Sequence, residues 1–202
     1  MIEEIAIIQL DPRFIKQLEA ADKVAHTNAP YSMEIYGAIL KQCPSCLELR
    51  MKLRNLQLKQ IANSTKGLSK LFGKVKITPF IKRGQGDKEP IDVINKAEEL
   101  IAKSPSNIPA HQMLAEAAHL AQLPGTAVFA YETIKKLQPK DLGNLKNLGD
   151  AYIENGETDK AVETGNLIVS INPRDGDAED LMKRASVAAA MNRGKWEESE
   201  DF

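Results

Sequence analysis

Cysteine, histidine and aromatic residues are scarce in this chain of 202 residues, which has two cysteines, three histidines and only 5% Phe, Trp and Tyr. Two cysteines are too few for a disulfide framework in a domain of this size, so the fold must be held by burial. Long apolar runs are missing as well. The longest near the start, Ile5 to Leu10, is interrupted by Gln9 and lacks a basic segment before it. We therefore expect no secretory signal, no membrane span and a cytoplasmic location.

Signatures of catalysis are also missing from the sequence. It has no glycine-rich phosphate loop, no nucleophile elbow and no histidine pair at metal-ligand spacing. Adjacent acids such as Glu98 and Glu99 point to different sides of a helix, so they do not form an acid–base pair. The prediction is a protein without enzymatic activity, without a cofactor and without a bound metal.

Charge is nearly balanced overall, at a net −1, but it is unevenly distributed. Residues 1–88 hold 15 basic and 8 acidic side chains, whereas residues 89–202 hold 12 basic and 20 acidic ones. Such an asymmetry concerns partners rather than fold. Self-association between the basic half of one molecule and the acidic half of another is one hypothesis.

Proline and small residues, by contrast, recur in a regular pattern. Pro105, Pro139 and Pro173 are each 34 residues apart, and an apolar residue follows each proline nine positions later. Proline lacks a backbone donor and disfavours helix in the residue before it, so each proline should end a helix. The small residues of the pattern, which would let two helices approach closely, are Ala115, Gly149, Ala127 and Ala161. A fixed period of this length predicts repeated pairs of antiparallel helices.

These positions resemble the tetratricopeptide repeat family. The residues that carry the resemblance are Leu148-Gly149, Tyr152, Ala161 and Pro173 in 142–175, and Leu114-Ala115, Ala127, Tyr131 and Pro139 in 108–141. The chain departs from the family pattern at His111 and Leu145, where tryptophan is common, and at Gly165, where a large aromatic is usual. The resemblance implies an all-α fold, namely a right-handed α-solenoid of antiparallel helix pairs.

The same punctuation gives the expected organisation of residues 1–202 as a single solenoid. Pro44 and Pro105 are further apart than one period, which indicates a repeat split by an insertion between its two helices. The expected parts are a degenerate helix pair (13–46), a split repeat (47–107) with a basic insertion (62–88), two regular repeats (108–141 and 142–175), a capping helix (176–193) and an acidic tail (194–202).

The resemblance also implies a function, which is to bind a protein or peptide segment in a concave groove lined by the first helix of each pair. The groove positions carried over from the family are Met51, Asn55, Gln112, Glu116, His119, Lys146, Asn147, Asp150 and Ile153. Family members that clamp a terminal carboxylate have asparagine where this chain has Glu116 and Asp150. An acidic peptide C-terminus is therefore disfavoured as the ligand, and a mixed or basic segment is favoured. The alternative is that these are ordinary solvent-facing residues.

The insertion contains a basic stretch, residues 66–83, that has no acid. Its basic and aromatic residues are Lys66, Lys70, Phe72, Lys74, Lys76, Phe80, Lys82 and Arg83. One helical face would hold Leu68, Leu71, Phe72 and Val75. Lys70 and Lys74 lie off that face, as in a basic amphipathic segment. Docking to an anionic membrane surface or another polyanion is the alternative function. The simpler interpretation is that the apolar residues of the insertion pack on the solenoid. Nucleic-acid binding is disfavoured, because the two aromatic residues lie in no known motif and offer little stacking.

Cys43-Pro-Ser-Cys46 has the spacing of a zinc or redox motif. Zinc needs four ligands, however, and no second cysteine pair exists, while the three histidines belong to different repeats. Pro44 stands where the repeat pattern expects a proline. We therefore interpret the two cysteines as small residues of a turn between repeats.

Overall fold

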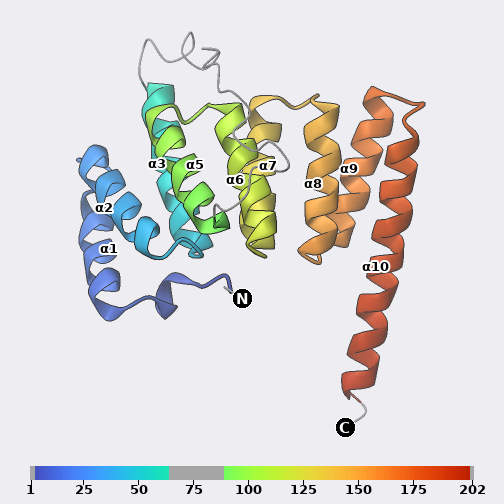
Figure 1. Ribbon diagram of the computed structural model, residues 1–202, viewed down its shortest axis with the longest axis horizontal. Helices are drawn as coiled ribbons and strands as arrows, with labels where there is room; N and C mark the ends of the chain where they lie inside the picture. The colour runs from blue at the N-terminus through green and yellow to red at the C-terminus, as the bar shows by residue number, and fades with distance from the viewer. Residues whose placement is uncertain (1–2, 64–88, 201–202) are drawn as a thin grey trace. The chain divides into compact units, whose positions relative to one another are not determined.

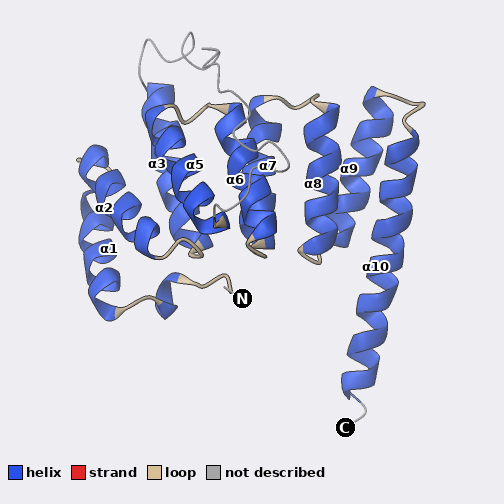
Figure 2. Cartoon of the chain, in the orientation of Figure 1, coloured by secondary structure: helices blue, strands red, loops and turns tan. Residues whose placement is uncertain are grey.

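The computed structural model describes residues 3–63 and 89–200, with side chains up to residue 192, and the secondary structure of this part is almost entirely α-helical (Figures 1 and 2). Its nine α-helices are α1 (Pro12–Val24), α2 (Ala29–Gln42), α3 (Leu47–Asn63), α5 (Pro90–Lys103), α6 (Ile108–Leu120), α7 (Pro124–Leu137), α8 (Leu142–Glu154), α9 (Thr158–Ile171) and α10 (Gly176–Glu200). A short 3-10 helix, η1 (Ile7–Gln9), precedes them. Helices pack mainly against their neighbours in sequence. The all-α prediction is confirmed, and the arrangement is consistent with repeated helix pairs.

Local sequence accounts for where the helices begin and end. The side chains of Asp11, Asn28, Asn107 and Asp141 each accept a hydrogen bond from a backbone N–H in the first turn of the helix that follows. Such a cap stabilises a helix by about 1 kcal/mol. At the other end, α5, α7 and α9 each stop two residues before a proline of the 34-residue period. Short-range chemistry therefore sets the helix boundaries.

The chain forms two compact units, Met1–Thr126 and Ala127–Phe202, and the division falls within α7. In the first unit, residues from the N-terminal segment and from α1, α2 and α3 form one core. The buried members of this core are Leu10, Leu18, Ala21, Tyr36, Ile39, Leu40, Cys46, Leu49 and Leu53. A single continuous solenoid remains a prediction, because each unit is defined by its own internal contacts.

In the second unit, Leu145, Ile168, Ala178 and Leu181 form the core of α8, α9 and α10. Gly165, the departure from the family pattern, has a reason here. A Cβ at this position would lie 2.5 Å from Cγ of Met182 on α10, so the missing side chain makes room for the next helix. Met182 itself is the apolar residue that the period places after Pro173.

Helix α10 is longer than the sequence pattern predicted. The capping helix was expected to end at residue 193, with a separate tail, but the helical backbone runs to Glu200. No proline interrupts this stretch, and the lone Gly194 costs a helix only about 1 kcal/mol relative to alanine. Helix therefore extends through most of the segment expected as an acidic tail.

The basic insertion lies mostly outside the described residues. Helix α3 runs to Asn63, which takes up the first two residues of the expected 62–88 insertion, and residues 64–88 are not described. All eight basic and aromatic positions predicted there fall in that range. Among the described helices, none is both long enough and apolar enough to cross a bilayer.

Candidate functional site

The first unit contains a groove between α2, α3 and α5 with a volume of about 690 Å³. This size lies within the roughly 300–1,000 Å³ of typical ligand sites. Most of its surface is apolar, and its rim is polar. Each helix contributes side chains three or four positions apart, which is the spacing of one helical face. These are Met33, Gly37 and Leu40 from α2, Leu53, Gln57 and Ile61 from α3, and Asn95, Glu98, Glu99 and Ala102 from α5.

Gly37 is the least expected of these lining residues. It lies in the middle of α2, where glycine destabilises a helix by roughly 0.5–1 kcal/mol relative to alanine. Close packing does not explain it, because a Cβ built at this position meets no described atom within 4 Å. The missing side chain instead leaves open space along the groove wall. A ligand could approach the backbone of α2 closely at this point.

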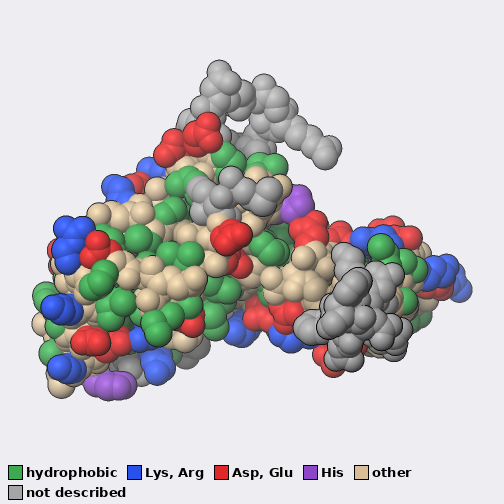
Figure 3. All heavy atoms as spheres, turned by 90° about the horizontal axis from the view of Figure 1, so that it is seen from below, with side chains coloured by type: hydrophobic (Ala, Val, Ile, Leu, Met, Phe, Trp, Pro, Cys, Tyr) green, Lys and Arg blue, Asp and Glu red, His purple; other side chains and the backbone are tan. Residues whose placement is uncertain are grey.

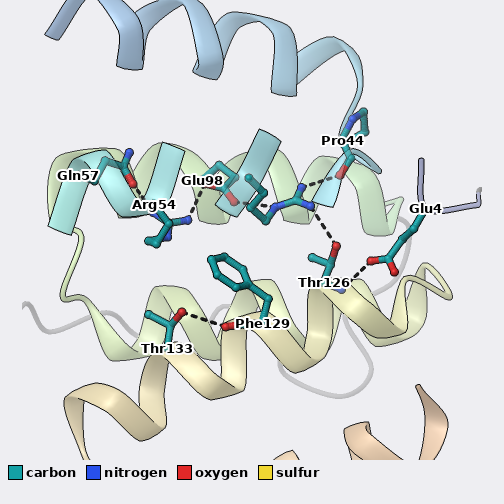
Figure 4. A network of polar contacts seen from close by, with 9 residues as sticks. Glu4, Pro44, Arg54, Gln57, Glu98, Thr126, Phe129 and Thr133 are labelled. Carbon is teal, nitrogen blue, oxygen red and sulfur yellow. Dashed lines mark hydrogen bonds and ion pairs between the residues drawn. The ribbon is translucent and has the colours of Figure 1, made fainter. Parts of the chain in front are cut away.

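Beneath the groove lies a buried ionic network that we call the arginine network, centred on Arg50, Arg54 and Glu98 (Figure 4). Arg50 Nε donates to one carboxylate oxygen of Glu98 at 2.9 Å, and Arg54 Nη2 donates to the other at 2.8 Å. The two arginine side chains are only 0% and 1% exposed. Burial opposes ionisation of Glu98, but the two guanidinium groups outweigh it and hold its pKa below the usual value. The carboxylate is therefore charged.

Three further contacts hold the two arginines in place. Arg50 donates to the hydroxyl of Thr126 at 3.0 Å and to the carbonyl oxygen of Pro44 at 2.5 Å. Arg54 donates to the side-chain oxygen of Gln57 at 2.5 Å. Glu98 and Gln57 line the groove, so the arginine network positions part of its surface. Two guanidinium groups share one carboxylate, which leaves a net positive charge below the groove, and Arg54 Nε has no hydrogen-bond partner among the described residues.

His111, where the family often has tryptophan, lies beside this network and is fully buried. Its Nε2 is 2.9 Å from the carbonyl oxygen of Pro105. A carbonyl can only accept, so Nε2 carries the proton and Nδ1 keeps its lone pair. Burial and, secondarily, the charge of Arg54 lower the pKa of His111 to about 4. The imidazole is therefore neutral at physiological pH and serves as a packed core residue.

The predicted groove positions in the first unit lie elsewhere. Met51 and Asn55 are exposed on α3, and neither lines the α2–α3–α5 groove. Gln112, Glu116 and His119 are exposed on α6 at positions that share a helical face, so the structure brings these three together. They too lie outside the groove lining. Although the side chain of Glu116 is exposed, desolvation by the atoms around its carboxylate raises its pKa.

In the second unit, two of the predicted positions are engaged in ion pairs. Lys146 Nζ lies 2.7 Å from a carboxylate oxygen of Asp177 and 3.1 Å from one of Asp175. Asp150 accepts from Arg184 of α10 at 2.7 Å. Of the other two positions, Asn147 is exposed, and Ile153 is half-buried and packs against the core. The charged positions of α8 thus contact α10 and the turn before it.

The two cysteines are free, and Cys46 is buried while Cys43 is partly buried. Burial raises the pKa of both thiols, so neither is an activated thiolate. Within the described part of the chain, no cluster of three His, Cys, Asp or Glu residues could hold a metal. The structure gives the cysteines the surroundings of core and turn residues.

Sequence reasoning missed the α2–α3–α5 groove because it looked at the first helix of each pair, whereas two walls of this groove are second helices. One local signal was available, namely the glycine at the centre of α2. The resemblance to the tetratricopeptide family rests on the residues quoted above, since comparison with family models and with curated proteins found no match to this chain.

Proposed function

We propose that the chain is a non-enzymatic interaction scaffold, similar to tetratricopeptide proteins, that binds a segment of a partner protein in the α2–α3–α5 groove. The observation that carries the proposal is the open wall at Gly37. Replacing Gly37 with alanine would stabilise the helix, and the added Cβ would contact no described atom. A ligand site requires open space beside an apolar surface and polar groups that are held in place, and the groove has both.

The occupant that fits best is an amphipathic α-helix. Three helical faces line the groove, and a fourth helix would pack its apolar residues against Leu40, Leu53 and Ala102 in the manner of a bundle. Glycine at the wall supports this choice, because helices approach most closely where one of them lacks a side chain. The rim carries charges of both signs, Glu34 and Lys41 among them. A partner helix with mixed charges flanking its apolar face is complementary to that rim.

The test is to replace Gly37 with a larger residue whose side chain occupies the groove. A library of amphipathic helical peptides displayed on phage is selected on the wild-type protein, and the best binder is synthesised with a fluorescent label. Its affinity is then measured by anisotropy for wild type, Gly37→Leu and the matched control Ala38→Leu. Ala38 is the next residue on α2, is exposed, and does not line the groove.

We expect Gly37→Leu to weaken binding at least about tenfold and Ala38→Leu to leave it within about twofold. The midpoint of thermal unfolding of Gly37→Leu should not fall, because leucine is a better helix former than glycine. Equal affinity of the two variants, or no peptide that binds wild type in preference to Gly37→Leu, would contradict the proposal.

A role at an anionic membrane surface or another polyanion remains a second hypothesis, supported by the sequence of residues 66–83 alone. On the face of the molecule drawn in Figure 3, acidic, basic and apolar side chains of the described residues are intermixed, with no field of one sign. The insertion is the candidate for attraction to polyanions, because residues 66–83 hold six basic side chains and no acid. Flotation with anionic liposomes, with and without residues 64–85, tests this, since salt-sensitive binding should vanish with the deletion.

A further inference from the structure

The N-terminal segment is fastened across the first unit by contacts that span most of its length in sequence. We call residues 3–10 the N-terminal strap. Ile5 forms a parallel bridge with Cys46 and donates its N–H to the carbonyl oxygen of Ser45 at 3.2 Å. The N–H of Ile7 donates to the carboxylate of Glu48 at 2.9 Å. Both isoleucines pack against the core that contains Cys46, so we expect release of the strap to expose this thiol.

At its far end the strap reaches the N-terminus of α7. The carboxylate of Glu4 accepts from the backbone N–H of Gly125 at 3.0 Å and from that of Thr126 at 2.6 Å. A carboxylate is favoured there, since the first N–H groups of a helix lack partners and the helix dipole attracts negative charge. Glycine at 125 leaves room for this contact, because a Cβ there would lie 2.5 Å from Glu4 Oε2 and 2.9 Å from Leu47 Cδ2 and would displace both side chains.

Thr126 joins this contact to the arginine network. Its N–H is held by Glu4, and its hydroxyl accepts from Arg50. A row of polar contacts therefore leads from Glu4 through Thr126 and Arg50 to Glu98. Figure 4 labels Glu4, Thr126 and Glu98 in this row. Glu98 lines the groove. The strap and the groove are thus connected through one continuous set of hydrogen bonds and ion pairs.

We propose that the N-terminal strap is a latch for the groove, with Glu4 as a positioning residue that acts through Thr126 and Arg50. When Glu4 leaves, the first turn of α7 loses the acceptor for two N–H groups and frays. Thr126 then moves away from Arg50 and leaves a buried donor without a partner. The guanidinium must reorient to recover a hydrogen bond, which disturbs its contact with Glu98 and the groove surface that Glu98 forms.

Regulation of binding rests on the proposed function, but the coupling between strap and groove does not, so the test measures the two separately. The variants are Glu4→Gln, which keeps the shape of the side chain but loses one acceptor, and Gly125→Ala, which displaces the carboxylate by steric overlap. Glu3→Gln is the matched control, since Glu3 is exposed. All three are made in a Cys43→Ser background, so that Cys46 is the only thiol.

The first measurement follows the latch through the rate at which Cys46 reacts with a disulfide reagent. The second follows the groove without any ligand, through amide hydrogen exchange of residues 53–61. Local opening raises both rates in proportion to the population of the open form. We expect an increase of about tenfold or more in both rates for Glu4→Gln and Gly125→Ala, and no change for Glu3→Gln. The affinity of the selected peptide should fall in the same two variants.

Three results would overturn the latch. One is a Cys46 rate that stays at the wild-type value in Glu4→Gln, because the carboxylate would then not fasten the strap. Another is faster Cys46 reaction without faster exchange in residues 53–61, because release of the strap would then not reach the groove. The third is the same increase for Glu3→Gln. If Gly125→Ala fails to fold, Glu4→Gln decides the matter. Absence of peptide binding to wild type would overturn the proposed function and leave the exchange result standing.

Discussion

Two ionic contacts, one from each unit of this protein, differ in how deeply they are buried. In the first unit, Arg50 and Arg54 are buried and share Glu98, beneath a groove. In the second, Asp150 and Arg184 form a pair in which each side chain is about half exposed. Breaking a buried pair strands a charge and costs about 3–5 kcal/mol, whereas an exposed pair contributes about 0–1 kcal/mol. The buried ion pairs hold part of a groove surface in place, whereas the exposed pair adds little to the contact between two helices.

The helical glycines of the two units also differ in what lies beside them. No described atom lies within 4 Å of a Cβ built at Gly37 in the first unit. At Gly149 in the second unit, the side chain of Leu181 occupies the place that a Cβ would take. A glycine whose missing side chain makes room for a neighbouring residue has a packing role. A glycine on the wall of a groove, with no described atom in contact with an added Cβ, has no packing role among the described residues.

The strongest test of the ionic comparison is Glu98→Gln. This change leaves two buried guanidinium groups without a carboxylate, so the free energy of unfolding of the first unit should fall by about 3–5 kcal/mol. Urea unfolding followed by circular dichroism measures the loss. Asp150→Asn, in the second unit, is the matched control. A loss below about 1 kcal/mol for Glu98→Gln would show that the buried network is no more important than the exposed pair.

The second test uses pH. The pKa of His111 is about 4 in the folded protein, against about 6.5 in an unfolded chain. A lowered pKa means that its stabilising effect is fully present above pH 6.5 and is lost as the pH falls toward 4. The loss between pH 8 and pH 5 should be about 2 kcal/mol. His111→Gln, whose amide can still donate to the Pro105 carbonyl, should lack that part of the pH dependence. Identical pH profiles for the two proteins would argue against a buried neutral imidazole.

The glycine comparison is sharpened by making one substitution at both sites. Gly149→Ala should destabilise the second unit by about 1–3 kcal/mol, because Leu181 has to move within a packed core. Gly37→Ala should instead stabilise α2 by about 0.5–1 kcal/mol. Thermal unfolding of the two variants provides the comparison. Destabilisation by Gly37→Ala would mean that the space beside α2 is filled in solution by the chain itself.

The smallest expected effect is that of Arg184→Gln. Its partners Asp150 and Asp180 are both exposed, so the free energy of unfolding should change by less than about 1 kcal/mol. Added salt should reduce even this difference, since exposed pairs are screened. A large, salt-independent loss would remove the distinction between the two units.

Sequence alone predicted much of the fold. The prolines at 105, 139 and 173 indicate where helices end, and the apolar residues between them indicate helical faces. Both are local properties, so a single sequence can reveal them. Gly165 looked like a defect in the repeat pattern, and its reason, the side chain of Met182, became clear only when the two helices were seen in contact. Helix α10 exceeded its expected length because charge patterning does not end a helix.

The candidate site was much less predictable, and the reason is physical. Arg50 meets Glu98 across 48 positions in sequence, and Glu4 meets Thr126 across 122. No local pattern distinguishes a buried arginine from an exposed one, because the distinction lies in which carboxylate the packing brings to it. The sequence by itself determined an all-α chain punctuated by proline. Only the tertiary structure decided which helices enclose a groove, which charges lie beneath it and what the N-terminal strap fastens, since these depend on long-range contacts.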